Sequence, residues 1–132
     1  MNTPVSFELS KELKEKGFDL PCRLLYKSEK ELEEGIGVDY DWNKFDSYSA
    51  PTIAEVVCWI YNKYDIWISL IPDSSSGYRL LNRKFSVSIF RFNMNLNVQV
   101  EIIRKNKDIL YFNLPENAFD YAINYTIKNL IQ

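Results

Sequence analysis

The sequence predicts an α+β fold in one domain, residues 1–132, with an antiparallel or mixed sheet of four to six strands packed against about three helices. Segments with helical periodicity lie at the start, middle and end of the chain, and most segments with strand alternation lie between the second and third of them. The length of 132 residues suits a single domain, and a hydrophobic content of 46% is enough for a packed core.

The first predicted helix begins after Ser6, whose side chain can cap it, and stops at Gly17, which accepts the left-handed conformation common at helix ends. An extended segment starts at Pro21, and the charged run 27–37 after it is typical of an acidic turn with a partner strand. Residues 38–49 mix aromatic residues with Asp, Asn and Ser without a regular period. We predict a loop there, called the aromatic loop below.

A second helix is predicted over about residues 52–64, because Thr52 and Glu55 have the spacing of a capping box. A broad apolar stripe predicts that most of this helix is buried. The stripe contains Ile53, Val56, Val57, Ile60 and Tyr64, widened by Ala54, Cys58 and Tyr61. Trp59 lies among polar neighbours on the helix surface, so it is either covered by the aromatic loop or exposed to a partner.

After Asp65 the apolar period changes to two, which predicts a strand over residues 66–71. Both faces of this strand are apolar, so we expect it to be central in its sheet. Residues 72–77 end the strand with a proline and a run of serines. They lack the glycine spacing and the lysine of a phosphate-binding loop.

Alternating apolar residues continue over residues 85–102, with a change of phase at Ile89 and Phe90. A hairpin that turns near residues 93–97, with a bulge at the phase change, accounts for this pattern. We expect the apolar row that contains Phe90 and Phe92 to face the core, and Arg91 to lie on the opposite, polar face.

A further strand is predicted over residues 108–114, and Pro115 begins the last predicted helix, residues 115–131. The expected buried side of this helix consists of Phe119, Ala122, Ile123, Thr126, Ile127 and Leu130.

Three segments, residues 6–22, 50–70 and 115–131, together resemble a group of small uncharacterised proteins carried by phages, prophages and other mobile elements of gut bacteria. The middle segment is the most specific, because its A-P-T-x-x-E-V opening, its late tryptophan and its I-W-I strand recur in that order. The relatives tend to have Ser, Thr or Asp before the proline of the last helix, where this chain has Leu114, with Asn113 as a candidate substitute cap. The resemblance implies an α+β fold and a mobile-element origin, and it supplies no catalytic residue.

Histidine is absent, which removes the usual base of serine and cysteine nucleophiles and the commonest metal ligand. No paired nucleophile and base, and no set of metal ligands, can be assembled from the remaining residues, so we expect no catalysis, no cofactor and no metal. Cys22 and Cys58 are too few for a disulfide framework and are expected to be reduced thiols, with Cys58 packed as a small apolar residue. The chain shows neither a signal-peptide pattern nor a membrane span, so we expect a cytoplasmic protein, and the resemblance implies that its host is a bacterium.

Charge is unevenly distributed. Residues 29–46 carry seven acidic residues against two lysines, a net charge of -5, and residues 79–107 carry seven basic residues against one glutamate, a net charge of +6. The acidic run lacks the ligand spacing of a calcium loop and is typical of a solvated turn.

The favoured function is binding of a protein partner. The predicted contact surface is the aromatic loop together with Trp59, because Trp and Tyr are enriched at interface hot spots. Its residues are Tyr40, Trp42, Phe45, Tyr48 and Trp59. In the alternative, these rings fold down over the second helix as a satellite core. Self-association is a further candidate.

The alternative function is that of a nucleic-acid-binding accessory protein that uses the basic region 79–107. Basic side chains would bind phosphates while bases stack on nearby aromatic rings. The candidate residues are Arg79, Arg83, Lys84, Arg91 and Arg104. A solvated sheet face explains the same residues without a ligand.

Overall fold

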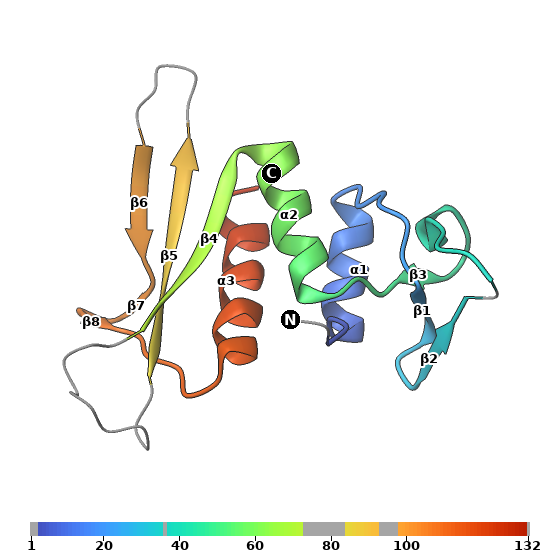
Figure 1. Cartoon of the computed structure of the whole chain (residues 1–132), viewed down its shortest axis with the longest axis horizontal. Coiled ribbons are helices and arrows are strands. Elements are labelled where there is room, and N and C mark those ends of the chain that lie inside the picture. The colour runs from blue at the N-terminus through green and yellow to red at the C-terminus, as the bar shows by residue number, and fades with distance from the viewer. Residues whose placement is uncertain (1–2, 36, 73–83, 93–97, 132) are drawn as a thin grey trace.

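The computed structural model describes residues 3–35, 37–72, 84–92 and 98–131. The predicted α+β class is confirmed, with three α-helices and strands that pair antiparallel throughout the described residues. The described strands form three small sheets, ordered β2-β1-β3, β4-β5-β6 and β7-β8, instead of one sheet of four to six strands. The sheets β2-β1-β3 and β4-β5-β6 cannot join into one, because the three helices lie between them (Figure 1).

The helix α1 (Phe7–Glu15) begins and ends where its local chemistry predicts. The Ser6 side chain accepts a hydrogen bond of 3.2 Å from the backbone N–H of Leu9, and Gly17 follows the helix with a φ of +85°. Only glycine reaches such a φ without steric cost.

The first sheet is formed by β1 (Leu24–Ser28), β2 (Glu31–Glu34) and β3 (Tyr48–Ser49). The predicted strand with an acidic partner strand is therefore confirmed. The aromatic loop is more regular than expected, because it contains the single-turn helix η1 (Trp42–Lys44) and ends in β3.

The helix α2 (Ile53–Tyr64) has the predicted capping box: the N–H of Glu55 donates to the Thr52 hydroxyl at 3.2 Å, and the N–H of Thr52 donates to the Glu55 carboxylate at 3.0 Å. The core stripe is narrower than predicted, because Cys58 and Tyr61 are exposed. The expectation that Cys58 packs as a small apolar residue was therefore wrong.

The main sheet is formed by β4 (Ile66–Pro72), β5 (Phe85–Phe92) and β6 (Val98–Ile102). The predicted hairpin is confirmed by the pairing of Phe92 with Val98, and its turn at residues 93–97 lies outside the described residues. Among the described strands β5 is central, whereas β4, which we expected there, lies at an edge.

The register decides which side chains of β5 share a face. Val87 and Ile89 are fully buried against the helices, and Arg91 follows on the same face because no bulge interrupts the pairing between them. Phe90 therefore lies on the face turned away from the helices. The expectation that the row of Phe90 and Phe92 faces the core was wrong, since it required the bulge.

The strands β7 (Arg104–Lys105) and β8 (Asp108–Ile109) form a short hairpin, so the strand predicted over residues 108–114 is shorter in the structure. The backbone of Phe112 still pairs with Phe85 at the end of the main sheet.

The helix α3 (Pro115–Asn129) has Leu114 at its N-cap position, and no side chain caps it, so Asn113 is not the substitute cap. The Tyr125 hydroxyl donates a hydrogen bond to the Glu101 carboxylate, which ties α3 to β6. The fully or nearly fully buried residues of α3 are Ala118, Ala122, Ile123, Thr126 and Ile127.

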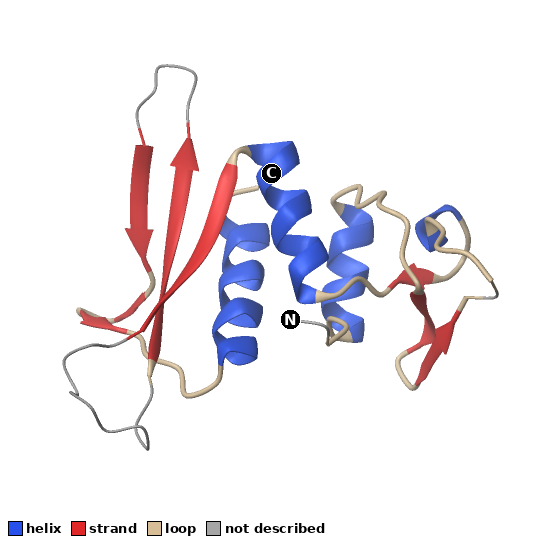
Figure 2. Ribbon diagram, viewed as in Figure 1, coloured by secondary structure: helices blue, strands red, loops and turns tan. Residues whose placement is uncertain are grey.

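The elements form successive layers along the longest axis of the molecule. Figure 2 shows the main sheet at one end, the three helices in the middle and the small sheet with the aromatic loop at the other end. The core unites residues of all three helices with the helix-facing side of β4 and β5. No helix of the described chain is long and apolar enough to cross a membrane.

Candidate functional site

The aromatic loop is fastened to α1 by polar contacts to its backbone. The Lys14 ammonium donates to the carbonyl oxygens of Phe45 at 2.7 Å and Ser47 at 2.9 Å, and it lies 4.8 Å from the centre of the Tyr48 ring. The Asn43 side chain donates to the carbonyl of the residue that follows α1 by three positions, Phe18, at 2.9 Å. These contacts give the loop a defined conformation without a partner.

Trp42 is fixed in orientation at the base of the loop. Its indole N–H donates to the carbonyl of Cys22 at 2.7 Å, and its ring packs against the edge of the core. The other side of the ring lies against Gly35, where a Cβ atom would come within 2.2 Å of the indole. The close approach therefore depends on glycine at this position.

Tyr40 and Phe45 present their rings to solvent. The exposed fraction is 39% for Tyr40 and 55% for Phe45, and the two rings are stacked with centroids 5.7 Å apart. Tyr40 also contacts Trp42, with ring centroids 5.5 Å apart. The two exposed rings thus stand on the half-buried, hydrogen-bonded Trp42, which lowers the entropic cost of using them in binding.

A cleft lies beside these rings. It has a volume of about 480 Å³. Its lining is mostly apolar side chain with one cation and one anion, from Leu25, Lys27, Trp42, Phe45, Asp46 and Ser47. A cleft of this composition suits an apolar side chain with a polar flank.

Two residues predicted for this surface have a different place. Tyr48 is half-buried and packs edge-on against Phe7, with ring centroids 5.4 Å apart. Trp59 is 3% exposed and packs against Phe18 and Tyr64 at 5.2 and 5.5 Å between ring centroids. Trp59 is therefore a core residue, and the prediction that it belongs to a contact surface is corrected.

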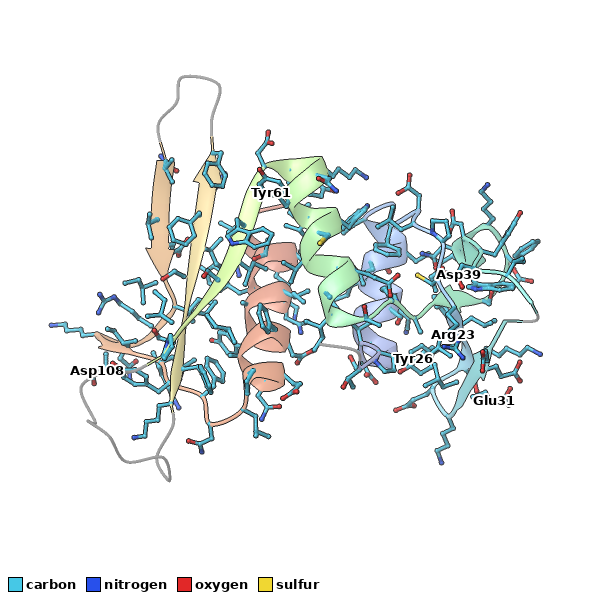
Figure 3. All side chains as sticks on the ribbon, viewed as in Figure 1. Arg23, Tyr26, Glu31, Asp39, Tyr61 and Asp108 are labelled. Carbon is cyan, nitrogen blue, oxygen red and sulfur yellow. The ribbon has the colours of Figure 1, made fainter. Side chains whose placement is uncertain are left out.

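The surroundings of the cleft are acidic. Glu31 and Asp39 lie at the small-sheet end of the molecule, as Figure 3 shows, and the glutamates of β2 are exposed. Two of these glutamates pair with cations: Glu34 with Arg23 at 2.7 Å and Glu33 with Lys27 at 3.2 Å. Both pairs are solvent-exposed and therefore weak. When Arg23 and Lys27 are counted with residues 29–46, the net charge changes from -5 to -3, so the region stays acidic.

The thiols do not form a reactive pair. Burial raises the pKa of Cys22 from 9.0 to about 12, and the carboxylates of Glu55 and Asp41 add to the rise. The protonated Cys22 thiol is not a nucleophile at neutral pH. Cys58 is free and exposed on α2. Among the described residues, no group of three His, Cys, Asp or Glu side chains could hold a metal ion.

Two of the described basic residues of the alternative site, Lys84 and Arg91, lie at opposite ends of one strand. Lys84 precedes one end of β5, whereas Arg91 lies near the other end, about 20 Å away along an extended strand. Arg104 lies in β7, and its guanidinium donates to the carbonyl of Lys107 at 3.3 Å. Arg79 and Arg83 lie outside the described residues.

Sequence reasoning missed a second apolar surface. The outer face of the main sheet, turned away from the helices, carries no charged side chain among the described residues; we call it the outer sheet face. It consists of Trp67, Ser69, Ile71, Ser86, Ser88, Phe90, Phe92, Val98, Val100 and Ile102. Within it Ser86 and Ser88 are buried, and the rings of Trp67 and Phe92 contact the Tyr61 ring of α2, with centroids 5.5 and 6.2 Å apart. The signal was present in β4, which is apolar on both faces although it lies at the edge of the described sheet.

These features define an α+β protein with a preformed aromatic cleft at one end and an uncharged sheet face at the other. Comparisons with known proteins identify no relative: no protein-family model, no curated protein and no solved structure matches the chain.

Proposed function

We propose that this chain is a binding protein that acts through a protein partner, with the aromatic loop and its cleft as the contact surface. The observation that carries the proposal is the exposed stack of Tyr40 and Phe45 beside a cleft, held on a fixed Trp42. Rigid aromatic side chains next to a pocket are typical of interface hot spots, because they bury a large area at a small entropic cost.

The charge of the region indicates what kind of partner fits. Residues 29–46 carry a net charge of -5, and the cleft lining is largely apolar. A partner that inserts an apolar side chain into the cleft and surrounds it with Lys or Arg would be complementary in both respects. A cytoplasmic location in a bacterial host and a phage or mobile-element origin belong to this proposal and rest on the sequence resemblance.

The test is affinity capture from a lysate of the host with tagged protein, quantified by mass spectrometry. Replacing Phe45 by Ser removes an exposed ring, so we expect the captured partner to fall at least about 10-fold. The matched control is Tyr111→Ser, which removes an exposed ring far along the chain, near the end of the main sheet.

The control should capture the same partner in the wild-type amount. Equal capture by Phe45→Ser and the wild type would contradict the proposed surface. Both variants must keep the wild-type unfolding temperature, so that a loss of capture reports on contact and not on folding.

A further inference from the structure

The cleft beside the aromatic loop has a charged end. Asp46 lines it together with Phe45, the residue before it, and the Asp46 carboxylate makes no ion pair within the described residues. The other charged residue of the lining is Lys27, whose ammonium lies 3.2 Å from the Glu33 carboxylate. The lining therefore offers a carboxylate next to an exposed aromatic ring, while its own cation is already paired.

The backbone around Asp46 is held on both sides. The Lys14 ammonium donates to the carbonyl oxygens of Phe45 and Ser47, at 2.7 and 2.9 Å. The Ser47 hydroxyl in turn donates to the carbonyl oxygen of Trp42 at 2.8 Å. The Phe45 ring and the Asp46 carboxylate are thus presented from a fixed backbone, which reduces the entropic cost of binding a ligand between them.

The aromatic rings of the loop contact a cation within the chain itself. The Lys44 ammonium lies 5.8 Å from the centre of the Tyr40 ring, within the range of a cation–π contact. In the described chain no such contact is made to Phe45, whose ring is 55% exposed and lines the cleft. Of the two stacked rings, Phe45 is therefore the one that a cation from another molecule can reach.

We propose that the protein partner presents an arginine to this cleft, with the guanidinium stacked on the Phe45 ring and bound to the Asp46 carboxylate. The inference rests on the proposed function and deepens it by naming a residue of the partner. Arginine suits both groups at once, because its planar guanidinium stacks on aromatic rings and donates two parallel hydrogen bonds to a carboxylate. Its aliphatic stem would lie along Leu25 and Trp42, the apolar part of the lining.

The charge and size of the site agree with this ligand. Residues 29–46 together with Arg23 and Lys27 carry a net charge of -3, which repels the phosphates of a nucleic acid and attracts a basic segment of a protein. The volume of about 480 Å³ is that of a site for a whole small ligand. The cleft therefore has room for an apolar side chain of the partner beside the arginine.

The test uses Nα-acetyl-arginine amide as a probe, added to the purified, isotope-labelled full chain and followed by two-dimensional NMR. We expect saturable shifts of the Trp42 indole N–H and of the backbone amides of residues 45–47, with a dissociation constant in the millimolar range. Nα-acetyl-citrulline amide has nearly the same shape without the charge and should cause no saturable shift there. Nα-acetyl-lysine amide should bind more weakly than the arginine probe, because an ammonium is compact and strongly hydrated.

Three variants assign the contacts of the probe. Asp46→Asn removes the charge with little change of shape and should weaken binding at least about 5-fold. Phe45→Leu keeps an apolar side chain but removes the ring, and it should weaken binding about 2- to 5-fold. Asp108→Asn is the matched control, because Asp108 is also exposed but lies at the opposite end of the molecule (Figure 3), and it should leave binding unchanged.

Capture from the host lysate distinguishes a failure of this inference from a failure of the proposed function. We expect Asp46→Asn to lose the partner as Phe45→Ser does. A partner that is lost with Phe45→Ser but retained by Asp46→Asn would overturn the arginine contact alone. Equal binding of the arginine and citrulline probes, or no saturable shift with either, would also overturn it. A wild-type chain that captures no protein would contradict the proposed function and this inference with it.

Discussion

Burial separates two aromatic residues that look alike in the sequence. Trp59 has polar neighbours on the helix surface and Phe45 has them in the chain, yet Trp59 is 3% exposed and Phe45 is 55% exposed. The Lys63 ammonium lies 5.0 Å from the centre of the Trp59 ring, so the long side chain of Lys63 itself helps to cover the ring. Helical position alone does not reveal this coverage, which is why the sequence left both alternatives open.

This difference predicts opposite effects on stability. Trp59→Ala removes a large core side chain and should lower the free energy of unfolding by about 3 to 5 kcal/mol. Phe45→Ser removes a largely exposed ring and should change it by less than about 1 kcal/mol. Urea unfolding followed by circular dichroism measures both. A Trp59→Ala variant as stable as the wild type would show that this tryptophan is not in the core.

Cys22 predicts a loss of stability at alkaline pH. Its pKa is about 12 in the folded protein and near 9.0 in the unfolded chain, so the unfolded state releases the proton first. The stabilisation is present below pH 9 and is lost between pH 9 and pH 12, by roughly 1.4 kcal/mol per pH unit. The measurement is the free energy of unfolding against pH for the wild type and for Cys22→Ala, which should lose this part of the slope. Identical slopes in both proteins would contradict the assignment.

Helix boundaries could be predicted because they depend on neighbouring residues. Ser6, Thr52 with Glu55, and Gly17 act through hydrogen bonds and dihedral preferences that span three or four positions. Which face of a strand is buried depends on how the strand pairs with its neighbours, and this pairing cannot be read from the sequence. The change of phase in the apolar alternation at Ile89 and Phe90 is compatible with a bulge or with a strand that is apolar on both faces. The structure shows the second arrangement.

The start of α3 predicts a stabilising substitution. Leu114 occupies the N-cap with an extended backbone, φ -118° and ψ 135°, and makes no capping hydrogen bond. Leu114→Ser should supply that bond and raise the free energy of unfolding by about 0.5 to 1 kcal/mol, a few degrees in melting temperature. Leu114→Ala is the control for losing the exposed leucine side chain. A serine variant that melts no higher than the alanine variant would contradict the prediction.

The layered arrangement places the aromatic loop and the main sheet at opposite ends of the molecule, with the helices between them (Figure 2). The sequence predicted the fold class and the three helices. It did not predict that the described strands divide among three separate sheets, because that depends on where the helices pack. The outer sheet face was missed for the same reason, since a row of apolar residues indicates a core until the covering layer is known.

The most direct test of the central claim, that the aromatic cleft binds a protein, is affinity capture from the host lysate with and without nuclease. We predict a protein partner that survives nuclease treatment and is lost with Phe45→Ser. Recovery that disappears with nuclease, or nucleic acid that copurifies independently of Phe45, would contradict the claim and favour the basic region 79–107.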